Sequence, residues 1–245
     1  MKQILFFVML LLLTACSVPE ERTPAPTPEA IHIIFPTTLK PWADYFAGCA
    51  NNNSLSALYF NQSPKSETNI DKNEVVLELG ESSQINEALY LSQVGWEQID
   101  VIVNKDNELS QIPIGKLQSI YSGQTSSWEN GIGQLIKVWV LPNGDPVRMY
   151  FDRAALQSSS LTSEARLAPD TEAMLEAISS DANAIGYLPI SILSSSDPSL
   201  VDKVKILQLD TALQEELNQP VIAITQGEPE GLIRELLVCV QGIFP

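Results

Sequence analysis

Short apolar runs alternate with amphipathic runs between residues 31 and 240, and this alternation constrains the fold more than any single motif. The apolar runs have strand length and are rich in β-branched and aromatic residues. They cover residues 31–35, 56–61, 74–79, 96–104, 136–140, 184–188 and 220–225. Helical spacing of apolar residues follows most of them, at residues 39–49, 114–121, 151–156, 171–178 and 232–240. Strands that alternate with helices predict the α/β class.

Turn and cap residues separate these runs. Thr37 or Thr38 is the expected N-cap of the first helix, with Pro41 in its first turn. The serine runs 158–160 and 194–196 predict loops. The order here is a strand, a polar turn and the start of a helix. The first N–H groups of a helix have no partner within the helix, so in this order they lie above the strand end and can hold an anion.

The first residues have the pattern of an export signal. Lys2 precedes an uninterrupted apolar run from Ile4 to Leu13, and Thr14-Ala15-Cys16 follows it. The run is shorter than the ~20 residues that a membrane-spanning helix needs. We therefore expect residues 1–15 to be a lipoprotein signal peptide, with lipid attached to Cys16. The alternative is a buried N-terminal helix.

Residues 16–30 predict a tether. They contain four prolines, at positions 19, 24, 26 and 28, and Val18 is their only large apolar residue. Such a segment cannot bury enough apolar surface to offset its ordering entropy. We expect it to hold a folded body, starting near Ile31, off the extracytoplasmic face of the cell membrane, with acyl chains on Cys16 as the anchor.

The charge balance excludes some partners. The formal net charge is −16, which argues against nucleic acid and against binding a membrane through basic residues. It does not exclude anion binding, because surface charge is screened over ~8 Å. We expect a monomer whose partners are a small polar solute and, for delivery, a permease.

Common catalytic patterns are missing. His32 is the single histidine, and no His, Cys and carboxylate residues have metal-ligand spacing. There is no phosphate-binding loop, dinucleotide fingerprint or CxxC motif. We therefore expect that the chain is not an enzyme and binds no cofactor or metal ion, although two carboxylates could still act as an acid–base pair. With Cys16 lipidated, Cys49 and Cys239 remain, either as a disulfide or as two buried thiols.

The order of several segments resembles one family. Residues 110–128, SQIPIGKLQSIYSGQTSSW, resemble the helix, Ser-Gly and Trp segment of phosphate-type solute-binding proteins of ABC transporters. Residues 99–107 are similar to the family's crossing strand, and residues 182–188, ANAIGYL, to a later strand. The resemblance implies a two-lobed, type II periplasmic-binding-protein-like fold with ligand in a central cleft. It places residues 31–98 and 191–245 in the first lobe and 99–190 in the second.

The resemblance also implies three ligand-binding loops. The first matches Thr37 and Thr38, and the second matches Glu78 and Ser82. The acid would accept the proton of a hydrogenphosphate, and the serine would donate a hydrogen bond. Ordinary capping and turn chemistry explains both loops equally well.

The third loop departs from the family's pattern. Gly144 is retained, but Asp145 stands where the family has a serine, and Pro146 stands where it has a second glycine. Asp145 would repel a dianion. Arg148 could offset this with a bidentate contact, or it could pair with Asp145 or Asp152 and be structural.

Two functions remain open on the sequence. The first is a lipid-anchored solute-binding protein for phosphate or a similar oxyanion, which delivers its ligand to an ABC permease. The alternative is a degenerate fold of the same kind that acts as a sensor or interaction lipoprotein in the envelope. A hydrolase would have to use a cleft carboxylate such as Glu78 or Asp145.

Overall fold

The computed structural model describes residues 29–51, 56–63, 69–81, 88–128 and 134–243, and all structural statements concern these ranges. The predicted signal peptide, Cys16 and most of the predicted tether lie outside the described residues. Within them, no helix has both the length and the apolar composition needed to cross a membrane.

Nine of the described strands form one mixed sheet with the order β2-β1-β3-β11-β4-β8-β6-β7, and β9 also pairs with β4. Strands β5 and β10 form a separate pair. The bounds are β1 Glu29–Phe35, β2 Ser56–Gln62, β3 Glu74–Leu79, β4 Leu89–Asn104, β5 Gln111–Ile112, β6 Lys137–Val140, β7 Arg166–Leu167, β8 Ala184–Pro189, β9 Val204–Ile206, β10 Gln208–Leu209 and β11 Asn218–Gln226.

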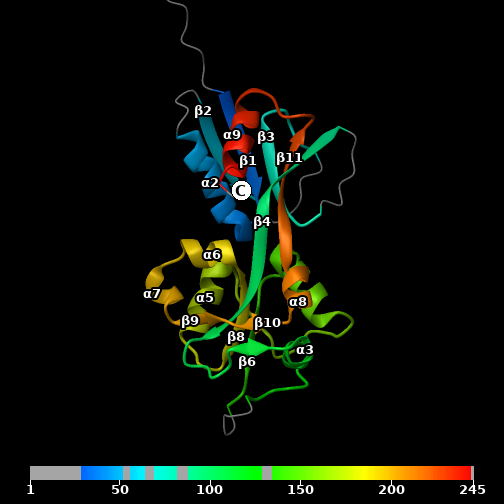
Figure 1. The fold of residues 1–245 in the computed structure, drawn as a ribbon, viewed down its shortest axis with the longest axis vertical. Helices are drawn as coiled ribbons and strands as arrows, with labels where there is room; N and C mark the ends of the chain where they lie inside the picture. Colours follow the sequence, from blue (N-terminus) through cyan, green and yellow to red (C-terminus); the bar gives the residue numbers. More distant parts are fainter. Residues whose placement is uncertain (1–28, 52–55, 64–68, 82–87, 129–133, 244–245) are drawn as a thin grey trace, which may run out of the picture.

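Helices flank this sheet (Figure 1), and the predicted α/β class is confirmed. The α-helices are α2 Lys40–Ala50, α3 Ile114–Tyr121, α4 Pro146–Phe151, α5 Thr171–Ser179, α6 Ile190–Ser195, α7 Pro198–Val201, α8 Thr211–Glu216 and α9 Gly231–Gln241. A 3-10 turn, η1 Thr37–Leu39, precedes α2, and a π-helical turn, η2 Asp152–Leu156, continues α4.

Strand β4 connects the two ends of the molecule. Its first part, residues 89–98, pairs with β11, and residues 99–103 pair with β8. In Figure 1 it runs from an upper group of elements to a lower one. We call β1, β2, β3, β11, α2 and α9 the upper lobe, and β5 to β10 with α3 to α8 the lower lobe.

The predicted lobe boundaries remain a proposal, and the strand pairing favours one change to them. Residues 204–209 were expected in the first lobe, but β9 pairs with the lower end of β4, and β10 pairs with β5. We therefore propose that the chain returns to the upper lobe near Asn218, where β11 begins, rather than at residue 191.

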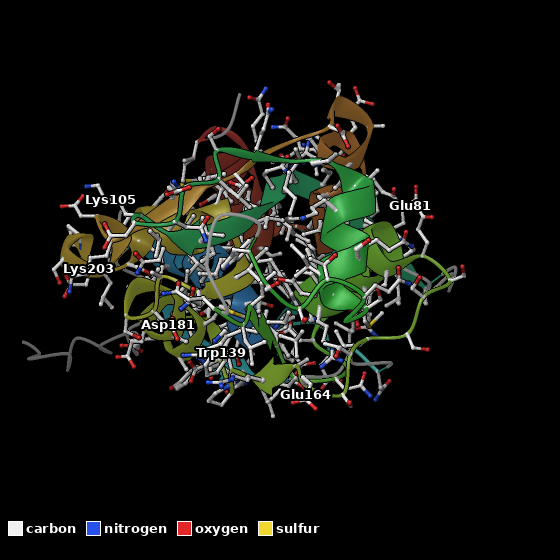
Figure 2. The ribbon with its side chains drawn as sticks, turned by 90° about the horizontal axis from the view of Figure 1, so that it is seen from below. Glu81, Lys105, Trp139, Glu164, Asp181 and Lys203 are labelled. Carbon is white, nitrogen blue, oxygen red and sulfur yellow. A yellow bond between two sulfur atoms is a disulfide. The ribbon has the colours of Figure 1, made fainter. Side chains whose placement is uncertain are left out.

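The burial of their apolar side chains stabilises these strands in the sheet. Strand β8 is buried along its whole length, as expected for an inner strand with helices on both faces. A single apolar cluster runs from Ile31 in the upper lobe to Tyr187 in the lower lobe. Figure 2 shows charged side chains such as Lys105, Lys203 and Glu164 at the periphery, around this interior.

Several local predictions were wrong. Neither Thr37 nor Thr38 caps α2, because the 3-10 turn η1 contains both residues and precedes the helix. The serine run 194–196 is not simply a loop, since α6 extends to Ser195. The crossing strand starts at Leu89 rather than Trp96. The helix expected at 151–156 starts earlier, at Pro146.

A buried polar cluster ties the lobes together beside β4. The Glu97 carboxylate is fully buried, and it accepts hydrogen bonds from Trp42 Nε1 at 2.5 Å and from the Ser191 backbone N–H at 3.0 Å. Trp42 belongs to α2, and Ser191 lies in the first turn of α6. The indole packs over Gly95, where a Cβ atom would lie 2.4 Å from the ring. Glu97 thus binds an upper-lobe helix and the start of a lower-lobe helix at once.

A disulfide joins the two helices that cover the upper lobe. Cys49 of α2 is bonded to Cys239 of α9, with 6.0 Å between their Cα atoms and 190 residues between them in sequence. A bond that closes such a long loop restricts the unfolded chain strongly.

Breaking this bond should destabilise the protein. We predict that Cys49→Ala with Cys239→Ala lowers the free energy of unfolding by about 2–5 kcal/mol, measured by urea denaturation. A reducing agent should lower the stability of the wild type by a similar amount and leave the double variant unchanged. A wild type that is insensitive to reduction would show that the two thiols are not bonded in solution.

The stability should also depend on Asp100. Burial of its side chain and, to a smaller extent, the charge of the nearby Glu97 together raise its pKa to about 6. A raised pKa means that the folded chain binds the proton more tightly than the unfolded chain. The stabilisation is therefore complete below the ordinary Asp pKa of ~4 and is lost as the pH rises through about 6.

Asp100→Asn removes this titration and keeps the shape of the side chain. Between pH 4.5 and 7.5, the wild type should lose free energy of unfolding relative to the variant, as measured by urea denaturation at both pH values. An equal difference between the two proteins at both pH values would contradict the assignment.

Candidate functional site

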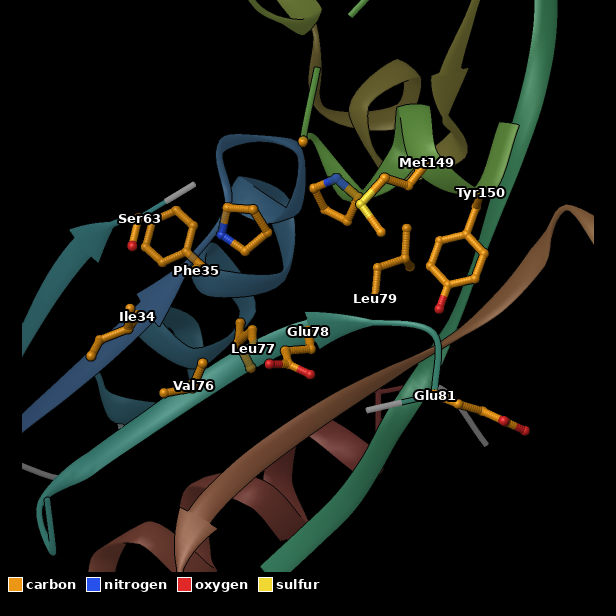
Figure 3. A pocket seen from close by; sticks show the side chains of 13 residues that line it. Ile34, Phe35, Ser63, Val76, Leu77, Glu78, Leu79, Glu81, Met149 and Tyr150 are labelled. Atoms are coloured by element: carbon orange, nitrogen blue, oxygen red, sulfur yellow. The ribbon is translucent and has the colours of Figure 1, made fainter. Parts of the chain in front are cut away.

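A cavity of about 190 Å³ lies where the ends of upper-lobe strands meet the start of α4 in the lower lobe (Figure 3). Its walls come from β1, β3, the residue after β2, and the segment around α4. The lining residues are Ile34, Phe35, Pro36, Ser63, Val76, Leu77, Glu78, Leu79, Glu81, Gly144, Pro146, Met149 and Tyr150.

The sheet places these residues together. Strands β2, β1 and β3 are parallel neighbours, so their carboxyl ends lie at one edge of the sheet. In open α/β sheets, this edge is where ligands bind. Phe35, Ser63 and Leu79 stand at or directly after the three strand ends. The cavity therefore occupies the position that the strand order favours for a ligand.

The loop before α4 forms the opposite wall. The Asp145 N–H donates to the Pro142 carbonyl at 3.1 Å, which closes a turn, and Gly144 has φ +89°. A side chain at that φ would be strained, so glycine suits the turn. The Asp145 carboxylate then caps α4, accepting from the N–H groups of Val147 at 2.9 Å and Arg148 at 3.3 Å.

Asp145 thus takes the hydrogen bonds that an anion at this helix start would use. Burial raises its pKa to about 6, although the N–H groups of Arg148 and Val147 oppose the shift. The Thr38 hydroxyl also lowers the pKa of Asp145, so it lies close to the carboxylate. Thr38 is buried, and its hydroxyl oxygen has no hydrogen bond of standard geometry within the described residues.

Arg148 is held by its own lobe. Its Nε donates to Asp152 Oδ2 at 3.1 Å, and its Nη1 donates to the Leu141 carbonyl at 2.7 Å. The Leu141 N–H in turn donates to the Tyr187 hydroxyl at 3.2 Å. Arg148 was considered either as a bidentate contact to an anion or as a structural partner of Asp145 or Asp152. These hydrogen bonds match the structural role, with Asp152 as the partner.

Tyr150 reaches across the cleft. A Cβ atom at Gly80 would lie 1.6 Å from the Tyr150 hydroxyl, so the ring lies against a residue that has no side chain. Gly80 follows β3 and has φ +81°. Burial raises the pKa of Tyr150, and the charges of Glu81 and Glu78 raise it further, while Arg153 and the Glu81 backbone N–H lower it.

The cavity is apolar and acidic. Among its described lining residues there are two glutamates, Glu78 and Glu81, and no lysine, arginine or histidine. The guanidinium of Arg153 lies 4.5 Å from the centre of the ring of Tyr150, a lining residue. In the described ranges, no group of three or more His, Cys, Asp or Glu residues could hold a metal ion.

The structure brings most of the predicted loops to this one place. Glu78 and Gly144 line the cavity, while Thr37 and Thr38 directly follow its lining residue Pro36. Asp145 stands between the lining residues Gly144 and Pro146, and Arg148 points into its own lobe. Ser82 lies outside the described residues. The ligand-binding roles of all of these residues remain predictions.

Of the lining residues, the predicted ligand-binding set contains only Glu78 and Gly144, and the missed wall residues include Met149 and Tyr150. A signal for them was present, because Pro146, Met149 and Tyr150 have the i, i+3, i+4 spacing that places side chains on one face of a helix.

Comparison with known sequences gave no result: no family model matches this chain, and no curated protein matches it.

Solved structures share its fold. A putative phosphate ABC transporter substrate-binding protein with bound phosphate, from Clostridium perfringens, matches with a TM-score of 0.70 and 16% identity, over 86% of this chain and 93% of its own. An ABC-type phosphate transport receptor from Vibrio cholerae matches with a TM-score of 0.62 and 15% identity, over 87% and 94%. The reduced OxyR regulatory domain of Pseudomonas aeruginosa matches with a TM-score of 0.61 and 11% identity, over 89% and 97%. At these identities the likeness shows the fold alone, which is the periplasmic-binding-protein-like fold.

Proposed function

We propose that this chain is an extracytoplasmic, lipid-anchored solute-binding protein that holds a small solute between its lobes and delivers it to an ABC permease. The observation that carries the proposal is the cavity of about 190 Å³ at the carboxyl ends of β1 and β3, bounded on the other side by α4. Concave, mostly apolar cavities with a few polar groups are typical of small-molecule sites.

The anchoring part of the proposal depends on the sequence. An apolar run ends at Thr14-Ala15-Cys16, and the proline-rich residues 16–30 precede β1. This order supports a lipid on Cys16 and a folded body outside the cytoplasm. The phosphate transport proteins that share the fold support a transport role, and the binding proteins among the neighbours support a non-enzyme.

The charged side chains around the cavity decide which class of solute we propose. The phosphate bound to the structural neighbour supports an oxyanion. The local chemistry opposes it, because Asp145 already caps α4, Arg148 is bonded within its lobe, and Glu78 faces the same space. Two unit charges of like sign 4 Å apart repel by ~4 kcal/mol at an effective dielectric constant of ~20. We therefore propose a small neutral or cationic solute with an apolar part that fits against Phe35 and Met149.

One observation favours a second candidate function. The Asp145 carboxylate fills the helix start that would otherwise receive an anion. A chain that supplies this group itself could serve as an envelope sensor or interaction lipoprotein without transporting a solute.

The proposal predicts stabilisation by solute. A screen of small amines, amino acids and polyols against the purified full chain should find a compound that raises the melting temperature. At 100 times Kd, the gain is about 2.7 kcal/mol, or about 5–10 °C for a chain of this size. Phosphate, sulfate, molybdate and tungstate at millimolar concentration should give no shift at pH 7.5.

A matched variant controls for binding elsewhere on the surface. Met149→Trp adds volume to the cavity wall and should abolish the shift caused by the active compound. A shift with phosphate would overturn the neutral or cationic class but keep solute binding. No shift with any compound class, including the oxyanions, would count against solute binding and favour the second candidate.

A further inference from the structure

A second hollow lies in the lower lobe, away from the cavity between β1, β3 and α4. Its volume is about 420 Å³, within the range of ~300–1,000 Å³ that is typical of small-molecule sites. In Figure 1 its walls around β5 and the start of α3 lie at the end of the molecule opposite the end at which β1 begins. We propose that this hollow binds a sugar unit. The proposal does not depend on whether the cavity beside α4 binds a solute.

Hydrogen bonds within the chain fix the walls of the hollow. Asn107, in the loop after β4, is buried; its Oδ1 accepts from the Leu109 N–H at 2.9 Å, and its Nδ2 donates to the Ala182 carbonyl at 3.2 Å. At the start of α3, the Ile114 N–H donates to Asp210 Oδ2 at 2.8 Å. Segments that are distant in sequence are therefore tied together around the hollow. Walls that are already formed lower the cost of ordering a binding site.

The apolar part of the hollow suits the C–H face of a sugar ring. Its apolar lining residues include Leu109, Ile112, Pro113 and Trp128, and Trp128 is partly exposed. The indole offers a large, flat apolar surface. Its Nε1 is shielded from solvent and has no hydrogen-bond partner within the described residues. An unpaired buried donor is costly, so a ligand oxygen that reaches it after a small turn of the ring would stabilise the complex.

The polar part of the hollow suits hydroxyl groups. Its polar lining residues include Asp106, Glu108, Gln111, Lys116 and Gln134. Carboxylates accept hydrogen bonds, an ammonium group donates them, and amides do both. A hydroxyl group both donates and accepts, so it can pair with all three kinds of side chain. Two carboxylates and one ammonium group oppose each other in charge, which favours a neutral, hydroxyl-rich ligand over a phosphate or a strongly basic compound.

The rim of the hollow is open enough for a sugar that belongs to a longer chain. Gln111, Pro113 and Ala182 line the hollow and are exposed. A free monosaccharide and one unit of a polysaccharide present the same ring and hydroxyl groups. The structure therefore assigns the chemistry of the sugar unit, and the experiment distinguishes its two sources.

Saturation-transfer NMR on the full chain tests the site. The probes are glucose, N-acetylglucosamine and the linear tetramer of each sugar. We expect at least one probe to bind, and we expect Trp128→Ala to weaken its Kd about 10-fold, which is typical of removing a central tryptophan. A tetramer that binds more tightly than its monomer supports a polysaccharide as the source, and equal Kd values support a free sugar. No binding of any probe at millimolar concentration would overturn the proposal.

Two control variants separate this hollow from the rest of the molecule. Trp96→Ala removes a tryptophan that is 56% exposed and does not line the hollow. Met149→Trp adds volume to the wall of the other cavity. Both variants should bind the probe with the Kd of the wild type. If Met149→Trp or Trp96→Ala weakens binding as much as Trp128→Ala does, the sugar binds elsewhere and the proposal is wrong.

A second variant keeps the test decisive if Trp128→Ala does not fold. Ala182 is exposed in the turn before β8, and Asn107 bonds only to its backbone carbonyl. Ala182→Trp therefore adds volume to the hollow and keeps this hydrogen bond. We expect it to abolish binding of the probe and to change the melting temperature by no more than about 2 °C. A folded Ala182→Trp variant that binds with the Kd of the wild type would show that the sugar does not occupy the hollow.

Discussion

Strand β4 is the constraint on which the rest of the structure depends. Its 16 residues pair with β11 in one lobe and with β8 and β9 in the other, so both halves of the sheet share one backbone. The upper-lobe strands follow β4 in the order β11, β3, β1 and β2. The carboxyl ends of β1 and β3 line one cavity together with the start of α4. The buried Glu97 binds Trp42 and Ser191 beside β4 and thereby fixes a helix of each lobe to it.

The cleft has the position of an anion site and a different chemistry. Its helix start is capped by the chain's own Asp145, and its arginine, Arg148, is bonded to Asp152 and a backbone carbonyl. What remains open is an apolar cavity with Glu78 in its wall. Structural likeness to a phosphate transport protein therefore shows the fold, while the proposal for the class of solute depends on the side chains around the cavity.

Sequence patterns predicted the elements whose signals are local. Residues 184–188 were recognised as a strand because an unbroken apolar run matches a strand buried on both faces. Residues 89–95 were missed because Tyr90 and Leu91 are exposed and polar residues follow them. The sequence therefore shows neither an apolar run nor a regular alternation of apolar and polar residues there. Gly144 was identified through the resemblance, because the third loop matches the family's pattern over a short local stretch. Tyr150 was missed because its role depends on Gly80, which is distant in sequence and reaches it only through the fold.

The central claim is that a small solute binds in the cavity between β1, β3 and α4 and holds together two lobes joined by β4. Pulsed electron resonance between spin labels at Tyr59→Cys on β2 and Glu176→Cys on α5, in a Cys16→Ser background, measures the separation of the lobes directly. With the compound that raises the melting temperature bound, we expect one narrow distance distribution that matches this structure. A broad distribution, or one centred on a longer distance, in the presence of that compound would contradict the claim.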